Sequence, residues 1–417
     1  MVPEGWTYST LEGLIDIKHG FAFKSEHFTN QGQFVLLTPG HFNESGGFRD
    51  QQEKTKYYNG VIPDGYLLTK GDLLLAMTEQ AAGLLGSAAH IPEDNIYLHN
   101  QRLGLVKVLS PNKIDSRFLF WVYNSPEVRK QIAEQASGTK VKHTSPGKLI
   151  GVSALIPPIA EQTKIAQILS TWDKAIATTE RLLANSQQQK QALMQQLLTG
   201  QKRLHGFSGS WLQVTLDEIF EKICNGTTYD ANAKTGLPVS RIETISTGKI
   251  NFSKVGWAPD NENTRRFKLK KGDILYSHIN SLEHIGRVAL FNIERPLFHG
   301  MNLLLLRPNT KVTPEFIFHM LNSEIGKKYA RNYAKSAVNQ ASISTTDIKS
   351  FVVNIPALEE QQKIAQVLST ADAEIANLQS QLAALKLEKK ALMQQLLTGQ
   401  RRVKLDAEVE APIRRVG

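Results

Sequence analysis

Cysteine is almost absent from this chain, with Cys224 the single example among 417 residues. One thiol cannot form an intramolecular disulfide, and it cannot supply the cysteine cluster of a structural zinc site. No apolar run approaches the roughly 18 residues that a membrane-spanning helix needs. The N-terminal stretch MVPEGWTYSTLEG also lacks the basic and apolar regions of a secretory signal. These absences predict a cytoplasmic protein.

Motifs of the common enzyme classes are missing as well. The sequence contains no GxxxxGK[ST] phosphate loop, no GxGxxG, no HExxH and no GxSxG. It also lacks the Asn-Pro-Pro-aromatic or Asp-Pro-Pro-aromatic tetrad of amino-methyltransferases, because its one Pro-Pro pair, Pro157–Pro158, follows Ile156. Its histidines are scattered and do not fall at metal-ligand spacing. The sequence therefore predicts a binding or assembly protein with no catalytic residues and no metal of its own.

Acidic residues are outnumbered by basic ones, 39 to 49, which gives a formal net charge of +10. The isoelectric point is about 9.4. A basic excess of this size favours a polyanionic partner, and nucleic acid is the commonest polyanion. The alternative is a soluble protein that is merely basic.

A long sequence repeat is the most prominent feature that is present. The ten letters ALMQQLLTGQ run from Ala192 to Gln201 and again, unchanged, from Ala391 to Gln400. Upstream, EQTKIAQILST matches EQQKIAQVLST, and each of these follows an Ile-Pro pair. Each ten-mer is followed by a basic pair, Lys202–Arg203 or Arg401–Arg402. One helical module is therefore written twice.

The stretches before each module correspond more loosely, as in LTKGDLLLAM against LKKGDILYSH. The chain thus alternates two variable domains with two nearly identical helices, the layout expected after a duplication. The predicted segments are a first variable domain (1–158), a first helix (159–204), a second variable domain (205–357), a second helix (358–404) and a C-terminal tail (405–417).

Each module shows an apolar seam with coiled-coil spacing. A helix of about 38 residues would be about 57 Å long, too long for an ordinary core helix. The two helices are therefore predicted to pack as an antiparallel pair related by a pseudo-twofold axis; in the alternative, each packs on its own domain. The predicted helix-pair core is Ile165, Leu169, Trp172, Ile176, Leu193 and Leu197 with Ile364, Leu368, Ile375, Leu378, Leu382, Leu385, Leu392 and Leu396. Further apolar positions, Met194 and Leu198 with Met393 and Leu397, would pack on the variable domains or on a partner protein.

The variable domains combine β-rich runs with short helical segments. Strands are predicted within 33–38, 72–77, 103–109, 287–293 and 302–308, and short helices within 116–124, 126–136 and 314–322. This mixture predicts α+β domains with a bent sheet, and the periodicity leaves the topology open.

Basic and amide side chains in the variable domains form the candidate DNA contacts, because Lys and Arg neutralise phosphates while Asn, Gln and Arg can read base edges. A solvated surface is the alternative for each of them. The candidates are Lys18, His19, Lys24, Lys140, Lys142 and His143 in the first domain, and Arg265, Arg266, Lys335, Asn339 and Gln340 in the second.

These features together resemble the specificity (S) subunit of type I restriction–modification systems. The marks are IPPIAEQTKIAQIL and IPALEEQQKIAQVL at the helix starts, LLTGQKRL and LLTGQRRV at the helix ends, and GFAFKSEHF and KGDLLLAM in the first domain. The resemblance implies that the variable domains are target recognition domains, each reading one half of a bipartite asymmetric DNA site. It also implies that the helices set the half-site spacing and dock two methyltransferase (M) subunits.

The same resemblance places catalysis in partner chains. The M subunits would bind S-adenosylmethionine and methylate adenine N6, and restriction (R) subunits would use ATP and Mg²⁺, so no cofactor is expected in this chain. Three alternatives remain open at this stage: a specificity subunit whose partner fuses methylase and nuclease, an autonomous methyltransferase, and a coiled-coil adaptor that reads no DNA.

Overall fold

The computed structural model describes residues 2–79, 83–138, 141–337 and 340–405. The chain forms two compact units. Unit 1 comprises residues 1–178 and 382–417, and unit 2 comprises residues 179–381. Two long helices, α4 (Ile159–Leu197) and α10 (Leu358–Leu397), each contribute their start to one unit and their end to the other.

Unit 1 is built on an antiparallel four-stranded sheet with the order β2-β10-β6-β8. Its strands are β2 (Ile15–His19), β10 (Leu103–Val108), β6 (Leu73–Ala76) and β8 (Ala88–His90). All four residues of β6 are buried, because this strand is central and helices cover the sheet. The short helices of this unit are α1 (Ser116–Tyr123), α2 (Pro126–Glu134) and α3 (Pro146–Ile150). A separate antiparallel pair, β1 (Thr7–Thr10) with β12 (Ser153–Ile156), joins the start of the domain to its end, just before α4.

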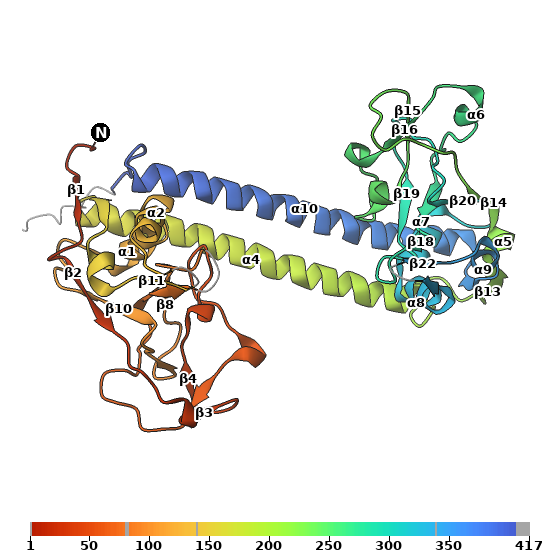
Figure 1. The fold of residues 1–417 in the computed structure, drawn as a ribbon. Coiled ribbons are helices and arrows are strands. Elements are labelled where there is room, and N and C mark those ends of the chain that lie inside the picture. The colour runs from red at the N-terminus through yellow and green to blue at the C-terminus, as the bar shows by residue number, and fades with distance from the viewer. Residues whose placement is uncertain (1, 80–82, 139–140, 338–339, 406–417) are drawn as a thin grey trace, which may run out of the picture. The chain divides into compact units, whose positions relative to one another are not determined.

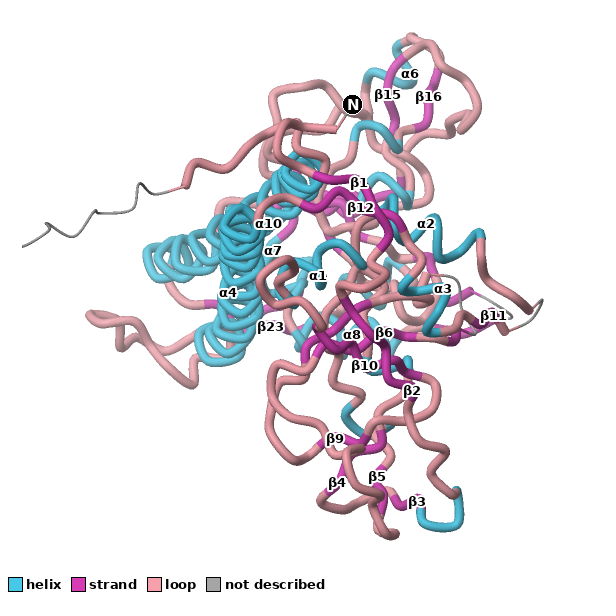
Figure 2. Tube along the Cα trace, turned by 90° about the vertical axis from the view of Figure 1, so that its left-hand side faces the viewer, coloured by secondary structure: helices cyan, strands magenta, loops and turns pink. Residues whose placement is uncertain are grey.

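Away from this sheet, unit 1 carries a second small sheet with the order β3-β5-β4-β9 (Figure 2). Its strands are β3 (Phe28–Thr29), β5 (Tyr57–Tyr58), β4 (Phe34–Leu36) and β9 (Tyr97–Leu98). A third pairing joins β7 (Thr78–Glu79) to β11 (Lys142–His143). The described residues of unit 1 also form the 3-10 turns η1 (Ser25–His27), η2 (Pro39–His41) and η3 (Gln52–Lys54).

Unit 2 repeats this organisation with a different sequence. Its four-stranded sheet has the order β14-β20-β17-β19, which corresponds to β2-β10-β6-β8. The strands are β14 (Phe220–Asn225), β20 (Leu304–Pro308), β17 (Asp273–Tyr276) and β19 (Val288–Phe291), and β13 (Leu212–Thr215) pairs with β23 (Val352–Ile355). The short helices are α5 (Leu216–Ile219), α6 (Glu262–Arg265), α7 (Pro314–Asn322), α8 (Glu324–Tyr333) and α9 (Thr345–Lys349). In a smaller pairing, β15 (Leu237–Val239) lies beside β16 (Gly256–Ala258). Strand β22 (Gln340–Ser342) pairs with β18 (Ile279–Asn280) on one side and with β21 (Lys335–Ala337) on the other. The 3-10 turns η4 (Ile242–Ile245) and η5 (Phe252–Lys254) lie in the same unit.

The prediction of α+β domains and of an internal repeat is confirmed, and the predicted strand runs contain β4, β6, β10, β19 and β20. The pairing of β1 with β12 had no sequence signal. All four residues of β1 are exposed, so TYST lacks the alternation of apolar and polar side chains that marks a half-buried strand.

Within each unit, the start of one long helix lies beside the end of the other, and both pack on the domain (Figure 1). In unit 1 Ile165 and Leu169 are buried with Leu396, and in unit 2 Leu197 is buried with Ile364 and Leu368. The other positions of the predicted seam are half-buried: Trp172, Ile176, Leu193, Ile375, Leu378, Leu382, Leu385 and Leu392. A side chain in a seam between two helices stays half-buried because the other helix covers only one side of it. Side chains at the helix ends are buried because a domain covers them as well. The additional apolar positions pack into the core of a domain, Leu198 in unit 2 and Met393 in unit 1.

Candidate nucleic-acid interface and helix junctions

An ion pair closes each junction between the long helices. In unit 1, Arg402 beyond the end of α10 donates from Nε and Nη2 to the buried carboxylate of Glu161 at the start of α4, at 2.9 and 2.5 Å. Its guanidinium also lies over the ring of Trp6, 5.6 Å from the centroid. The forked pairing with a carboxylate raises the pKa of Arg402. The glutamate that begins one repeat therefore binds the arginine that follows the other.

Unit 2 contains the same arrangement, built from the complementary helix ends. Arg203 donates from Nε and Nη2 to the two oxygens of Glu360, both at 2.6 Å, and lies over Trp211. The side chain of Glu360 is 2% exposed. Hydrogen bonding to Glu360 raises the pKa of Arg203. Two matched junctions explain why the starts and ends of the repeats are nearly identical.

A buried glutamine follows each of these glutamates and attaches the helix to its own domain. Gln162 accepts the backbone N–H of Asp115 at 2.9 Å and donates to the carbonyls of Lys113 and Pro157. Gln361 accepts the N–H of Thr313 and donates to the carbonyls of Lys311 and Pro356. Both side chains are fully buried, so each junction depends on a complete set of hydrogen bonds.

A second ion pair in each unit fixes the direction of the helices. In unit 1, Asp173 on α4 accepts from Lys389 on α10 at 2.5 Å. As the position on α4 advances from Glu161 to Asp173, the partner retreats from Arg402, just after α10, to Lys389 on α10. Unit 2 contains the corresponding pair, Asp372 with Lys190, also at 2.5 Å. The two helices therefore run antiparallel where they meet in each unit.

Several of the predicted DNA contacts gather on one hairpin in unit 1. Lys142 and His143 form β11 and are exposed, and Ser137 pairs with His143 across the hairpin. A cavity of about 640 Å³ beside it is lined by Lys142 together with Arg129 and Lys130 of α2. Lys140 lies outside the described residues.

The equivalent hairpin of unit 2 holds another group of the predicted contacts. Lys335 on β21 pairs with Ser342 on β22, as Ser137 pairs with His143 in unit 1. Lys335 and Gln340 are exposed. Asn339 lies outside the described residues. We call residues 137–143 and 335–342 the recognition hairpins.

The other predicted contacts in unit 1 lie elsewhere. Lys18 is half-buried, donates to the carbonyl of Gly65 at 2.7 Å, and its ammonium lies 3.9 Å from the centroid of the Tyr66 ring. His19 and Lys24 are exposed, and Lys24 is 3.7 Å from Glu26. Lys18 therefore has contacts within unit 1, and the DNA contacts of Lys18, His19 and Lys24 stay predictions.

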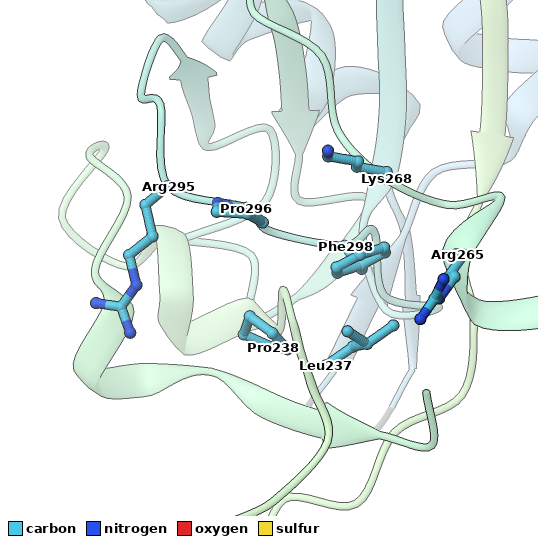
Figure 3. Close-up of a pocket in the computed structure, with 7 residues that line it drawn as sticks. All are labelled: Leu237, Pro238, Arg265, Lys268, Arg295, Pro296 and Phe298. Carbon is cyan, nitrogen blue, oxygen red and sulfur yellow. The ribbon is translucent and has the colours of Figure 1, made fainter. Parts of the chain in front are cut away.

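In unit 2, Arg265 and Arg266 belong to a region that also contains a cavity. This cavity has a volume of about 460 Å³ and is lined by Leu237, Pro238, Arg265, Lys268, Arg295, Pro296 and Phe298 (Figure 3). Arg266 is exposed and lies over the ring of Phe267. Arg265 and Arg266 were predicted from the sequence, whereas Lys268 and Arg295 were not, and Arg295 is an isolated cation between Glu294 and Pro296.

A groove in unit 2 lies between the end of α4 and the turn that joins α7 to α8. Its volume is about 550 Å³. One side is formed by the repeated ten-mer and the preceding turn of helix, including Lys190, Met194 and Gln195. The other side includes Ile325, whose side chain is 37% exposed, and the two lysines Lys327 and Lys328.

Four buried histidines have strongly lowered pKa values. Burial lowers the pKa of His99, His278, His299 and His319 to about 4, so they are neutral at pH 7. Ser369, His319 and Asp372 follow the order of a hydrolytic triad, but His319 Nδ1 has no hydrogen-bond partner and Asp372 is bound by Lys190. In the described part of the chain, no group of three or more His, Cys, Asp or Glu could hold a metal ion. The described helices also include none that is long and apolar enough to cross a membrane.

Comparison with known proteins connects this geometry to one family. Residues 3–185 and 209–387 match the family described as "Type I restriction modification DNA specificity domain". A putative type I restriction enzyme MjaX specificity subunit of Methanocaldococcus jannaschii is 44% identical over 193 residues, which are 45% of this chain and 45% of that relative. The type I restriction enzyme EcoKI specificity subunit of Escherichia coli is 24% identical over 382 residues, which are 88% of this chain and 82% of that protein.

A solved structure shows a similar fold. The type I restriction-modification system S subunit from M. genitalium matches with a TM-score of 0.62 at 17% identity, over 95% of this chain and 96% of that one. At this identity the likeness concerns the fold alone.

Proposed function

Because this chain belongs to the family of type I restriction modification DNA specificity domains, we propose that it reads DNA for a restriction–modification complex through its two recognition hairpins. Each unit would bind one half of a bipartite, asymmetric site. The observation that carries this proposal is the equivalent position of the two hairpins combined with their different side chains. Lys142 and His143 stand in one hairpin, and Lys335 and Gln340 stand in the other.

The side chains on the hairpins suit complementary tasks in DNA recognition. Lysines neutralise phosphates and position a protein on the duplex, while a glutamine can make a bidentate contact with adenine N6 and N7. Different side chains on one framework would read different bases, which is what an asymmetric site requires.

The repeated helix ends would dock two copies of one methyltransferase partner. Gln195 and Gln196 are exposed, and they recur as the exposed pair Gln394 and Gln395. Core packing does not explain this identity, because none of these side chains joins a core. A partner that binds both copies of the ten-mer would explain it. In unit 2 that partner would occupy the groove beside Met194 and Ile325.

The chemistry of the complex would reside in these partners. We place the sites for S-adenosylmethionine in the methyltransferase subunits, and those for ATP and Mg²⁺ in restriction subunits. A partner that fuses methylase and nuclease remains the alternative, and purification of the complex from its host would show whether one or two kinds of catalytic chain accompany this one.

The long helices would fix the distance between the half-sites. Helix α4 has 39 residues, about 58 Å at about 1.5 Å per residue. Inserting one full turn after Gln187, together with a matching turn in α10, should change the accepted spacer while both half-sites stay the same. An unchanged spacer would contradict this role.

The main test is mapping of N6-methyladenine in cells with and without the gene. We expect a bipartite motif that disappears on deletion. Exchanging residues 335–342 for the corresponding hairpin of a relative with another specificity should then alter one half-site and leave the other intact. Methylation that is independent of the gene, or a hairpin exchange that alters both halves, would reject the proposal.

A further inference from the structure

The cavity of unit 2 shown in Figure 3 combines an apolar bowl with a cationic rim. Leu237, Pro238, Pro296 and Phe298 form the walls, and Arg265, Lys268 and Arg295 stand around them. Its volume of about 460 Å³ is in the range of small-molecule sites. Proline has no backbone N–H to donate, so the bowl itself is poorly suited to a phosphate. The rim, by contrast, offers hydrogen-bond donors that carry positive charge.

Two cations of the rim are held in place by their neighbours. Asp260 accepts from Arg265 Nε and Nη2 at 2.6 and 3.0 Å. The guanidinium of Arg295 lies 4.5 Å from the centroid of the Phe252 ring. A guanidinium has five N–H donors, so the bond to Asp260 leaves donors of Arg265 for a ligand. Positioned cations lose less conformational entropy when an anion binds.

Unit 1 has the same framework without these charges. Lys268 bridges to Phe298 in unit 2 as Leu67 bridges to Leu98 in unit 1. Three positions before each bridged residue, Asp64 of unit 1 therefore corresponds to Arg265 of unit 2, and Asn95 corresponds to Arg295. Because an acid, an amide and an apolar side chain complete the same fold in unit 1, the three cations of unit 2 are not required for folding.

We propose that this cavity binds a nucleoside phosphate, with the base in the apolar bowl and the phosphate at the cationic rim, where Lys268, Arg265 and Arg295 stand on different sides. The inference rests on the proposed DNA-reading function, because the ligand we favour is a DNA nucleotide displaced from the duplex stack. A stacked base cannot enter a concave site, whereas a displaced nucleotide carries its phosphate to the rim. A free nucleotide has the same chemistry and is the other source that the experiment separates.

The test uses the full chain assembled with its methyltransferase partner. One variant, Lys268→Gln/Arg295→Gln, removes two charges of the rim, and another, Leu237→Trp, fills the bowl. The control variant, Lys54→Gln/Lys70→Gln, removes two exposed charges from unit 1. DNA duplexes carry 2-aminopurine at successive positions across the half-site read by unit 2 and its flanks. In a parallel arm, the N-methylanthraniloyl derivative of dAMP is titrated without DNA.

We expect 2-aminopurine fluorescence to rise at one position with the wild-type complex and the control, and to lose that rise with Leu237→Trp. Affinity for specific DNA should fall roughly ten- to hundred-fold when the base contact is lost. The rim variant should also reduce the salt dependence of binding. Binding of the dAMP derivative that both variants abolish, with no fluorescence rise on DNA, would support the cavity and assign it to a free nucleotide.

The proposal is overturned if the wild-type complex binds specific DNA but shows no fluorescence rise and no dAMP binding. It is also overturned if the rim and bowl variants behave like the control in both arms. Loss of specific DNA binding by the wild-type complex itself would instead reject the proposed function, so the two failures are distinguishable.

Discussion

Units 1 and 2 have matching residues at their helix junctions, but their sequences differ almost everywhere else. Glu161 with Arg402 repeats as Glu360 with Arg203, and Gln162 repeats as Gln361. In each ion pair the glutamate comes from one repeat and the arginine follows the other, so a change in one must be matched in the other. The described cationic and amide side chains of the recognition hairpins and the three cations of the unit 2 cavity are exposed. The ion-pair residues are therefore constant because each must fit its partner.

A fall in pH should produce the largest difference in stability between the two units. Burial lowers the pKa of His278, His299 and His319 in unit 2 to about 4, and that of His99 in unit 1 to the same value. Above pH 6.5 these groups are neutral in both the folded and unfolded states. Between pH 6.5 and 4 the unfolded chain takes up protons that the folded chain excludes, so the free energy of unfolding falls as the pH drops. Each such histidine contributes about 1.4 kcal/mol per pH unit.

Burial also lowers the pKa of His41 and His90 in unit 1. Because unit 2 holds three of the four histidines whose pKa falls to about 4, it should lose stability faster than unit 1 between pH 6.5 and pH 5. The measurement is the urea midpoint of each unit, obtained by equilibration at the chosen pH and pulsed hydrogen exchange at one fixed labelling pH. Equal losses in the two units, or a loss confined to unit 1, would contradict the expectation.

The buried glutamines should show the opposite pattern, an equal effect in both units. Gln361→Leu leaves the N–H of Thr313 and the carbonyls of Lys311 and Pro356 without their partner. Each unsatisfied buried group costs about 1–3 kcal/mol, so we expect unit 2 to lose at least about 2 kcal/mol. Gln162→Leu should destabilise unit 1 by a similar amount. Peptide-resolved hydrogen exchange measures both.

The matched control is Gln362→Leu, which changes the exposed neighbour of Gln361. It should be close to neutral, because no core or hydrogen bond is lost. If Gln361→Leu and Gln362→Leu had the same effect, the glutamine would not hold the junction together.

Sequence reasoning recovered the repeated part of the molecule better than the variable part. An exact repeat identified the long helices, and apolar runs identified central strands such as β6. The role of Glu161 and Arg402 was not visible, because an ion pair between residues 241 positions apart in the sequence leaves no local pattern. The cavity around Arg295 was missed for the same reason, since separate segments bring its cations together. The contacts of the Lys18 ammonium with Gly65 and Tyr66 were likewise not visible in the sequence.

Substitutions in the recognition hairpins should have the smallest effects on DNA binding. They should change overall affinity in unit 1 and base preference in unit 2. Lys142→Ala in unit 1 removes a charge that would contact phosphate, so binding should weaken to a similar degree on all sequences and the salt slope should fall by about 1. Gln340→Ala in unit 2 removes an amide that would read a base edge. It should relax the preference at one base pair by about 1–3 kcal/mol and leave the salt slope unchanged.

Titration of the assembled complex against libraries randomised in one half-site at a time, at several salt concentrations, separates these two outcomes. The exposed His143→Ala serves as a third variant on the same hairpin as Lys142, and it tests whether any change there acts through charge. If Gln340→Ala weakened binding to every sequence equally, the unit 2 hairpin would position the protein without reading bases. Specificity would then have to come from other segments of unit 2, and the difference between the hairpins would be one of charge alone.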